Sequence, residues 1–138
     1  MQNKTDWIRI LRYFSIPFSV FVFNYILFFL GTYDVLEWID IPMHFFGGGS
    51  VAIALFLTLN YFEEMGFLYL NKISKIVFLV SMVALIAVLW EFYEFSLEYL
   101  TGFNFQGNLN DTMSDLLLGL LGGLLSGISM VFPEKERS

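Results

Sequence analysis

The chain carries one histidine, and the residues that could work with it lie at helical spacings. His44 follows Asp40 by four positions, so the two side chains share a face if a helix begins early enough. Further acidic residues stand at Glu91, Glu94 and Asp115. Imidazole and carboxylate groups are general acids and bases, and they are also ligands for divalent cations. These five side chains are the first candidates for a site.

The composition indicates that the elements which position these residues lie in lipid. Of the 138 residues, 57% are hydrophobic and 14% are charged, whereas a soluble domain has about 25% charged residues. A chain of this length cannot bury so much apolar surface in a water-soluble core. The absence of cysteine excludes a disulfide framework and a thiolate metal site. With 7 basic and 13 acidic residues, a nucleic-acid partner is not expected.

Four apolar stretches reach or approach the roughly 20 residues that cross about 30 Å of hydrocarbon. They cover residues 13–30, 42–62, 73–97 and 112–132. Because the intervening loops are short, neighbouring helices should be antiparallel. The sequence therefore predicts an all-α protein, with residues 1–138 forming one up-down bundle of four transmembrane helices. The first stretch follows basic residues, as a signal peptide does, but no small-residue cleavage site follows it, so we expect a retained helix.

The basic residues predict how the bundle is oriented. All seven lie before the first stretch, between the second stretch and the first turn of the third, or after the fourth: Lys4, Arg9, Arg12, Lys72, Lys75, Lys135 and Arg137. Residues 31–41 and 99–111 contain none. Because cytoplasmic loops are enriched in Lys and Arg, we expect a multi-pass protein of the cell membrane with both termini in the cytoplasm.

The acidic residues continue rows of small residues along three of the predicted helices. These rows are Asp40, His44, Gly48 and Ala52; Ala84, Ala87, Glu91, Glu94 and Glu98; and Asp111, Asp115, Gly119, Gly123 and Gly127. Small residues mark the faces at which membrane helices pack closely, so the ionisable side chains should point into the bundle. We expect them to meet at one depth near its non-cytoplasmic end. Asn24 in the first helix should lie deeper and hydrogen-bond across helices.

Other polar residues have simpler interpretations. Two roles stay open for Asp111, an N-cap of the fourth helix or a ligand. Solvated charges are expected in a loop at Asp34 and Glu37 and in a cytoplasmic turn at Glu63 and Glu64, and an interfacial aromatic belt at Trp38, Tyr93 and Tyr99.

Buried carboxylates that lie close together need a cation, a proton or a basic partner. Since that side of the bundle has no Lys or Arg, the alternatives are a protonated pair, a His–carboxylate network or a bound divalent metal. The metal candidates are His44, Glu91, Glu94 and Asp115, with Asp40 and Asp111 in second rank. The catalytic candidates are His44, Glu91 and Glu94. This set does not distinguish zinc, manganese and calcium, and no other cofactor is expected.

Three blocks of sequence carry these residues: Asp40-x-Pro-x-His44-Phe-x-Gly-Gly, Trp90-Glu91-x-x-Glu94, and Asp111-Thr-x-x-Asp115 followed by Gly119 and Gly122-Gly123. In these blocks the chain resembles small polytopic bacterial membrane proteins of the YjdF type, whose function is not established. It is more distantly similar to the VanZ family, associated with glycopeptide-antibiotic resistance, but has Glu94 and Asp115 where amides are expected. The resemblance implies the architecture and the polar positions and supplies no reaction.

Three classes of function stay open, and whether the protein is an enzyme is one of the open points. The first is an enzyme that acts on lipid or cell-envelope components, with a metal or a Glu–His pair that activates water. The second is a proton- or cation-coupled carrier, which would have to be an oligomer because four helices line too narrow a path. The third is a non-enzymatic membrane assembly or envelope-stress factor whose polar cluster is structural. The expected partners are the lipid bilayer and a lipid or envelope substrate.

Overall fold

The structure, a computed structural model, describes residues 6–133, except for the side chain of Glu37, and these residues form helices joined by loops. The helices are α1 (Trp7–Phe29), α2 (Thr32–Val35), the 3-10 helix η1 (Glu37–Ile39), α3 (Asp40–Glu64), α4 (Lys72–Thr101) and α5 (Leu109–Val131). Of these, α1, α3, α4 and α5 are long and apolar enough to cross a membrane. The prediction of an all-α protein with four candidate spans is confirmed.

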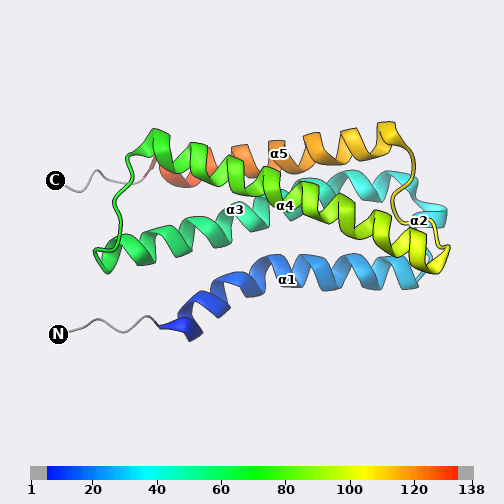
Figure 1. Ribbon diagram of the computed structural model, residues 1–138, viewed down its shortest axis with the longest axis horizontal. Helices are drawn as coiled ribbons and strands as arrows, with labels where there is room; N and C mark the ends of the chain where they lie inside the picture. Colours follow the sequence, from blue (N-terminus) through cyan, green and yellow to red (C-terminus); the bar gives the residue numbers. More distant parts are fainter. Residues whose placement is uncertain (1–5, 134–138) are drawn as a thin grey trace.

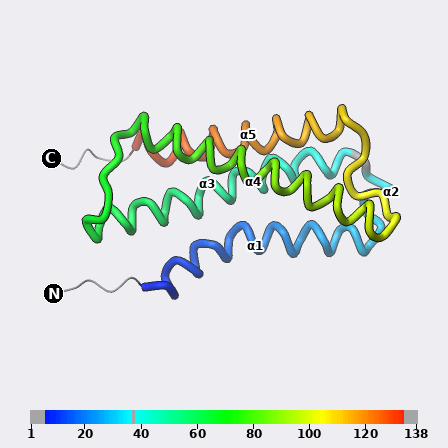
Figure 2. Tube along the Cα trace, viewed as in Figure 1, coloured from blue at the N-terminus to red at the C-terminus, as the bar shows by residue number. Residues whose placement is uncertain are grey.

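The four long helices lie side by side along one axis, and successive ones run in opposite directions (Figure 1). The tube view shows that α1 begins and α5 ends at the same end of the bundle (Figure 2). We call this the basic end, because it carries the Lys and Arg residues of the described part of the chain: Arg9, Arg12, Lys72 and Lys75. The opposite end, at which α3 and α5 begin, is called the polar end.

The helices extend beyond the apolar stretches because polar residues cap them. The Asp6 side chain accepts hydrogen bonds from the backbone N–H groups of Ile8 and Arg9, so α1 begins at Trp7 rather than at residue 13. At the other end of the bundle, α4 continues to Thr101 and is capped by Gly102, which adopts a left-handed conformation with φ of 75°. The predicted loop 31–41 is also largely helical, since it contains α2 and η1.

The N-cap of α5 is Asn108. Its Oδ1 accepts hydrogen bonds from the backbone N–H groups of Asn110 and Asp111, at 2.9 and 3.3 Å. The helix therefore begins at Leu109 rather than at residue 112. The capping role considered for Asp111 is wrong, because this residue lies inside the first turn, where it is exposed.

Glycines set the distance between α3 and α5, the pair of helices with the most extensive contact. A Cβ atom on Gly48 would meet the backbone oxygen of Gly119, and one on Gly122 would meet the carbonyl oxygen of Phe45. Any larger residue would force the two backbones apart, as expected for small-residue seams in membrane helices. The seam holds the first turns of α3 and α5 next to each other at the polar end.

The basic end is held together by ion pairs. Lys75 Nζ lies 2.8 Å from Glu63 Oε2, with 4% and 3% of the two side chains exposed, and it donates a hydrogen bond of 3.0 Å to Asn60 Oδ1. The prediction of a solvated charge at Glu63 is wrong, because α3 continues to Glu64 and places Glu63 against α4. Glu64 is exposed, and its Oε2 lies 3.2 Å from Arg9 Nη2.

The remaining polar predictions concern the surface. Exposed side chains are found at Asp34, Trp38, Tyr93 and Tyr99. The side chain of Glu37 and the residues Lys4, Lys135 and Arg137 lie outside the described part of the chain.

Candidate functional site

His44 lies at the centre of the polar end. Because α3 begins at Asp40, the two residues are one turn apart, and His44 Nε2 lies 3.3 Å from Asp40 Oδ1. Asp115 reaches the same nitrogen from α5, with its Oδ2 at 3.8 Å. The histidine and Asp115 side chains are 14% and 7% exposed. A mostly buried imidazole is therefore flanked by carboxylates from two helices.

The third helix of the site, α4, brings two more carboxylates to the histidine. His44, Glu91 and Glu94 each offer one ligand atom, and these atoms all lie within 4.8 Å of one another. Asp40, His44 and Asp115 form a second group by the same measure. The two groups share His44, and we call these five residues the His44 cluster. The other three first-rank candidates and Asp40 thus lie around the imidazole of His44.

Glu91 is the most buried acidic residue of α4, with 6% of its surface exposed. The side chains of Thr112 and Gln106 lie near its carboxylate. One of its oxygens, Oε2, is buried without a hydrogen-bond partner among the described residues. A buried oxygen that has lost its hydration without gaining a hydrogen bond costs about 1–3 kcal/mol, and more when it is charged. The described part of the chain offers no Lys or Arg at this end to compensate it.

Two acidic residues of the predicted rows are not part of the cluster. The second-rank metal candidate Asp111 belongs to neither ligand group and is exposed at the start of α5. Glu98 accepts backbone hydrogen bonds from Phe105 and Gln106 through Oε2, both at 3.1 Å. It therefore holds the loop that leads into α5.

Sequence reasoning missed the role of Tyr33. Its hydroxyl donates a hydrogen bond to Asn24 Oδ1, so Asn24 hydrogen-bonds across helices as predicted, and its partner lies on the short helix α2. Burial raises the pKa of the Tyr33 hydroxyl, and the negative charges of Asp40, Glu94 and Asp115 raise it further. Tyr33 is thus a neutral hydrogen-bond donor close to the acidic side chains. No periodic pattern pointed to it, because α2 is a single turn in a predicted loop.

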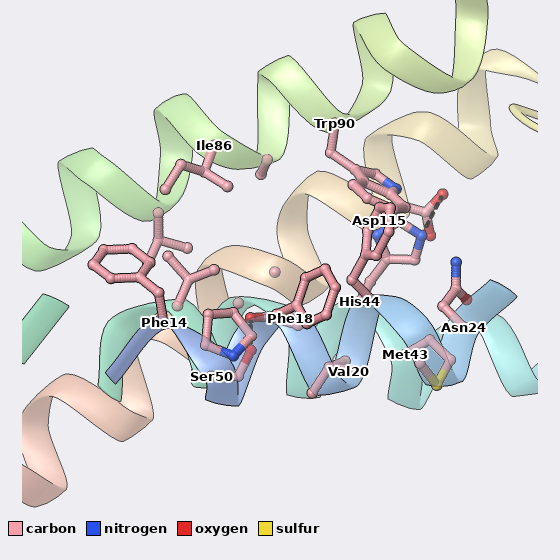
Figure 3. A pocket seen from close by; sticks show the side chains of 18 residues that line it. Phe14, Phe18, Val20, Asn24, Met43, His44, Ser50, Ile86, Trp90 and Asp115 are labelled. Carbon is pink, nitrogen blue, oxygen red and sulfur yellow. Dashed lines mark hydrogen bonds and ion pairs between the residues drawn. The ribbon is translucent and has the colours of Figure 1, made fainter. Parts of the chain in front are cut away.

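A cavity of about 450 Å³ adjoins the cluster. All four long helices line it, and His44 and Asp115 form part of its wall. Figure 3 shows these two side chains beside Trp90, while Phe14 and Ile86 lie far from them along the bundle. The wall is otherwise almost entirely apolar. The cavity was not predicted, because apolar residues that line a cavity have the same sequence pattern as residues that face lipid.

Known proteins were compared with the chain. A family model described as "Predicted membrane protein (DUF2238)" matches residues 5–135. The chain belongs to this family. The match supports the resemblance to YjdF-type proteins, whereas the more distant similarity to the VanZ family is not shown and stays a prediction. Searches of curated proteins and of solved structures each gave no match.

The His44 cluster of this DUF2238 protein has three chemical options, namely a bound cation, a His–carboxylate network, or a pair of carboxyl groups that share a proton. With a cation, it would supply one imidazole nitrogen and several carboxylate oxygens, a mixed set that suits zinc or manganese, while its oxygen-rich part also suits calcium. Without a cation, a protonated His44 can pair with Asp40 and Asp115, at the distances given above. Pairing of His44 with Asp40 and Asp115 alone leaves Glu91 Oε2 without a partner, and a proton on the Glu91 carboxyl would remove its charge.

Proposed function

We propose that the protein binds one divalent cation at the His44 cluster and acts with it on lipid or cell-envelope components. The observation that carries this proposal is the buried Oε2 of Glu91, which lacks a partner beside a histidine and three further acids. A cation would supply the missing partner, because removing a charge from water is costly unless an opposite charge compensates it.

The geometry supports a specific division of ligands. Asp40 and Asp115 approach His44 from α3 and α5, while Glu91 and Glu94 approach it from α4. A cation held among them would act as a Lewis acid, which polarises a carbonyl group or lowers the pKa of bound water. A carboxylate that is not bound to the cation could then act as the general base.

The metal content of detergent-purified protein tests the proposal. After exposure to zinc, manganese or calcium and removal of excess ion, wild-type protein should retain about one ion per chain. His44→Ala should lose it, because His44 belongs to both ligand groups. Asp34→Asn is the matched control, since Asp34 is an exposed acid outside the cluster. Wild-type protein that retains none of the three ions would contradict the proposal.

The proposed orientation has both termini in the cytoplasm and the His44 cluster on the other side of the cell membrane, with four up-down crossings. It rests on the basic residues at one end of the bundle. A reporter fused after Ser138 should be cytoplasmic, and one inserted near Asn104 should be external. The opposite pattern would place the cluster on the cytoplasmic side.

A second candidate function is a metal-free structural network in a membrane assembly or envelope-stress factor. The distances of 3.3 and 3.8 Å from His44 Nε2 to Asp40 and Asp115 favour it. In this case the wild-type protein holds no metal, and His44→Ala lowers the stability of the bundle instead of its metal content. The experiment above therefore separates the two candidates.

A further inference from the structure

The cavity beside the His44 cluster runs along the bundle and not across it. Its wall extends on α1 from Phe14 to Asn24 and on α4 from Val83 to Trp90. Phe14 and Asn24 are ten residues apart, which corresponds to about 15 Å along an α-helix. This is about half of the roughly 30 Å hydrocarbon core, so the cavity has the depth of one leaflet.

Both α1 and α4 line the cavity, but these two helices make few contacts with each other. Of the long helices, α1 packs mainly against α3, and α4 packs mainly against α5. Near the polar end α1 and α4 meet through aromatic side chains. The rings of Phe21 and Trp90 are edge to face with centroids 5.6 Å apart, and the hydroxyls of Tyr25 and Tyr93 are 2.6 Å apart. This aromatic bridge joins α1 and α4 near the polar end, so we place the opening of the cavity along the rest of this seam, where it faces the hydrocarbon.

The interior suits a hydrocarbon chain with one polar end. Its volume of about 450 Å³ lies within the range of about 300–1,000 Å³ that is typical of ligand sites. A group of the size of a water molecule occupies about 30 Å³, so the cavity has room for about 15 groups of that size along a hydrocarbon chain. The polar groups His44, Asn24 and Asp115 lie toward one end (Figure 3). Ser50 is no polar anchor, because its hydroxyl donates to the Gly47 carbonyl at 2.7 Å.

We propose that this cavity binds one acyl chain of a membrane phospholipid, which enters between α1 and α4 and brings its ester carbonyl to His44 and Asp115. Phospholipid chains are the solvent on the open side of the cavity, and their esters lie at the interfacial end of each chain. An ester carbonyl is neutral, so the acidic cluster does not repel it as it would repel a phosphate group. The position of the acyl chain is inferred from the cavity alone, whereas contact between the ester and a cation depends on the proposed function.

Photo-crosslinking tests this assignment with the full chain in phosphatidylcholine vesicles. The probe is a phosphatidylcholine with a diazirine in one acyl chain, and the labelled residues are identified by mass spectrometry. Val51 and Ala87 belong to the cavity wall, whereas Leu125, which is 54% exposed, lies outside it and reports contact with bulk lipid. We expect adducts at all three residues in the wild-type protein.

Two variants fill the cavity. Gly47 lines it, and a Cβ atom there has no neighbour within 4 Å, so Gly47→Leu should fold and occupy the space. Ile86→Trp is the second variant, and Leu85→Trp is its control, because Leu85 is 52% exposed outside the cavity. Both filling variants should lower the adducts on the cavity wall about tenfold, the effect of about 1.4 kcal/mol in binding. The control variant and the adducts at Leu125 should be unchanged.

The outcomes distinguish this inference from the proposed function, provided that metal content is measured on the same preparations. Missing adducts at Val51 and Ala87, or adducts that persist in both filling variants, would overturn the assignment even if metal is bound. Labelling of the cavity by a diazirine fatty acid but not by the phospholipid would also overturn it. Adducts without bound metal would instead refute the proposed function and leave the acyl-chain site in place.

Discussion

The two ends of the bundle both bury charged side chains, but they compensate them differently. At the basic end, Glu63 and Lys75 form a 2.8 Å ion pair between side chains that are almost fully buried. At the polar end, His44 faces carboxylates from three helices, and Glu91 Oε2 has no partner in the described part of the chain. Opposite charges are thus matched within the chain at one end and left unbalanced at the other.

This difference indicates where the function lies. A matched buried pair needs nothing from outside the protein, and removing either partner is costly. A buried polar group that lacks a partner is rare in native structures and calls for an explanation such as an ion or a catalytic role. The basic end is therefore interpreted as a structural clamp, and the polar end as the candidate site that, in the proposed function, an external cation completes.

The largest expected effect comes from breaking the clamp. Lys75→Met leaves Glu63 buried without its counter-charge and should lower the free energy of unfolding in detergent by about 3–5 kcal/mol. Lys72→Met is the control, because Lys72 Nζ makes a 3.4 Å contact to the Phe132 carbonyl in an exposed position, and its loss should cost at most about 1 kcal/mol. Equal losses in the two variants would mean that the basic end is not held by its buried pair.

A smaller effect is expected at the seam that aligns the polar end. Gly48→Ala places a Cβ against the Gly119 backbone, so α3 and α5 must separate, at a cost of about 1–3 kcal/mol. Because Asp115 then moves away from His44, retained metal should fall as well. Gly47→Ala is the matched control, since its Cβ meets nothing within 4 Å, and it should be neutral or stabilising by up to about 1 kcal/mol. Equal unfolding free energies and metal contents for both variants would contradict this role of the seam.

The sequence was informative where a long apolar helix makes a polar residue stand out. Because His44, Glu91 and Asp115 continue rows of small residues, the sequence predicts that they lie on inward faces. The structure groups them around the imidazole of His44. Hydropathy likewise identified the four candidate spans. Both features depend on local sequence patterns, which a single sequence is enough to reveal.

Features that depend on three-dimensional contacts could not be predicted in this way. Glu63 resembled a turn residue, because its partner Lys75 lies across a loop on the next helix. The cap at Asn108 was missed because apolar content was used to set the start of α5. Tyr33 lies in a one-turn helix, and the cavity is lined by apolar residues of four helices, so neither has a periodic signature.

The central claim, that an external cation completes the polar end, is tested most directly by Glu91→Gln. This change keeps the shape of the side chain and removes the charge of the carboxylate that lacks a partner at Oε2. Metal content and thermal unfolding should be measured together in detergent, with and without added ion. We expect the wild-type protein to bind about one ion per chain and to be stabilised by it, and Glu91→Gln to lose both properties. A wild-type protein without metal, and a higher unfolding temperature in Glu91→Gln, would contradict the claim and identify the cluster as a metal-free set of repelling acids.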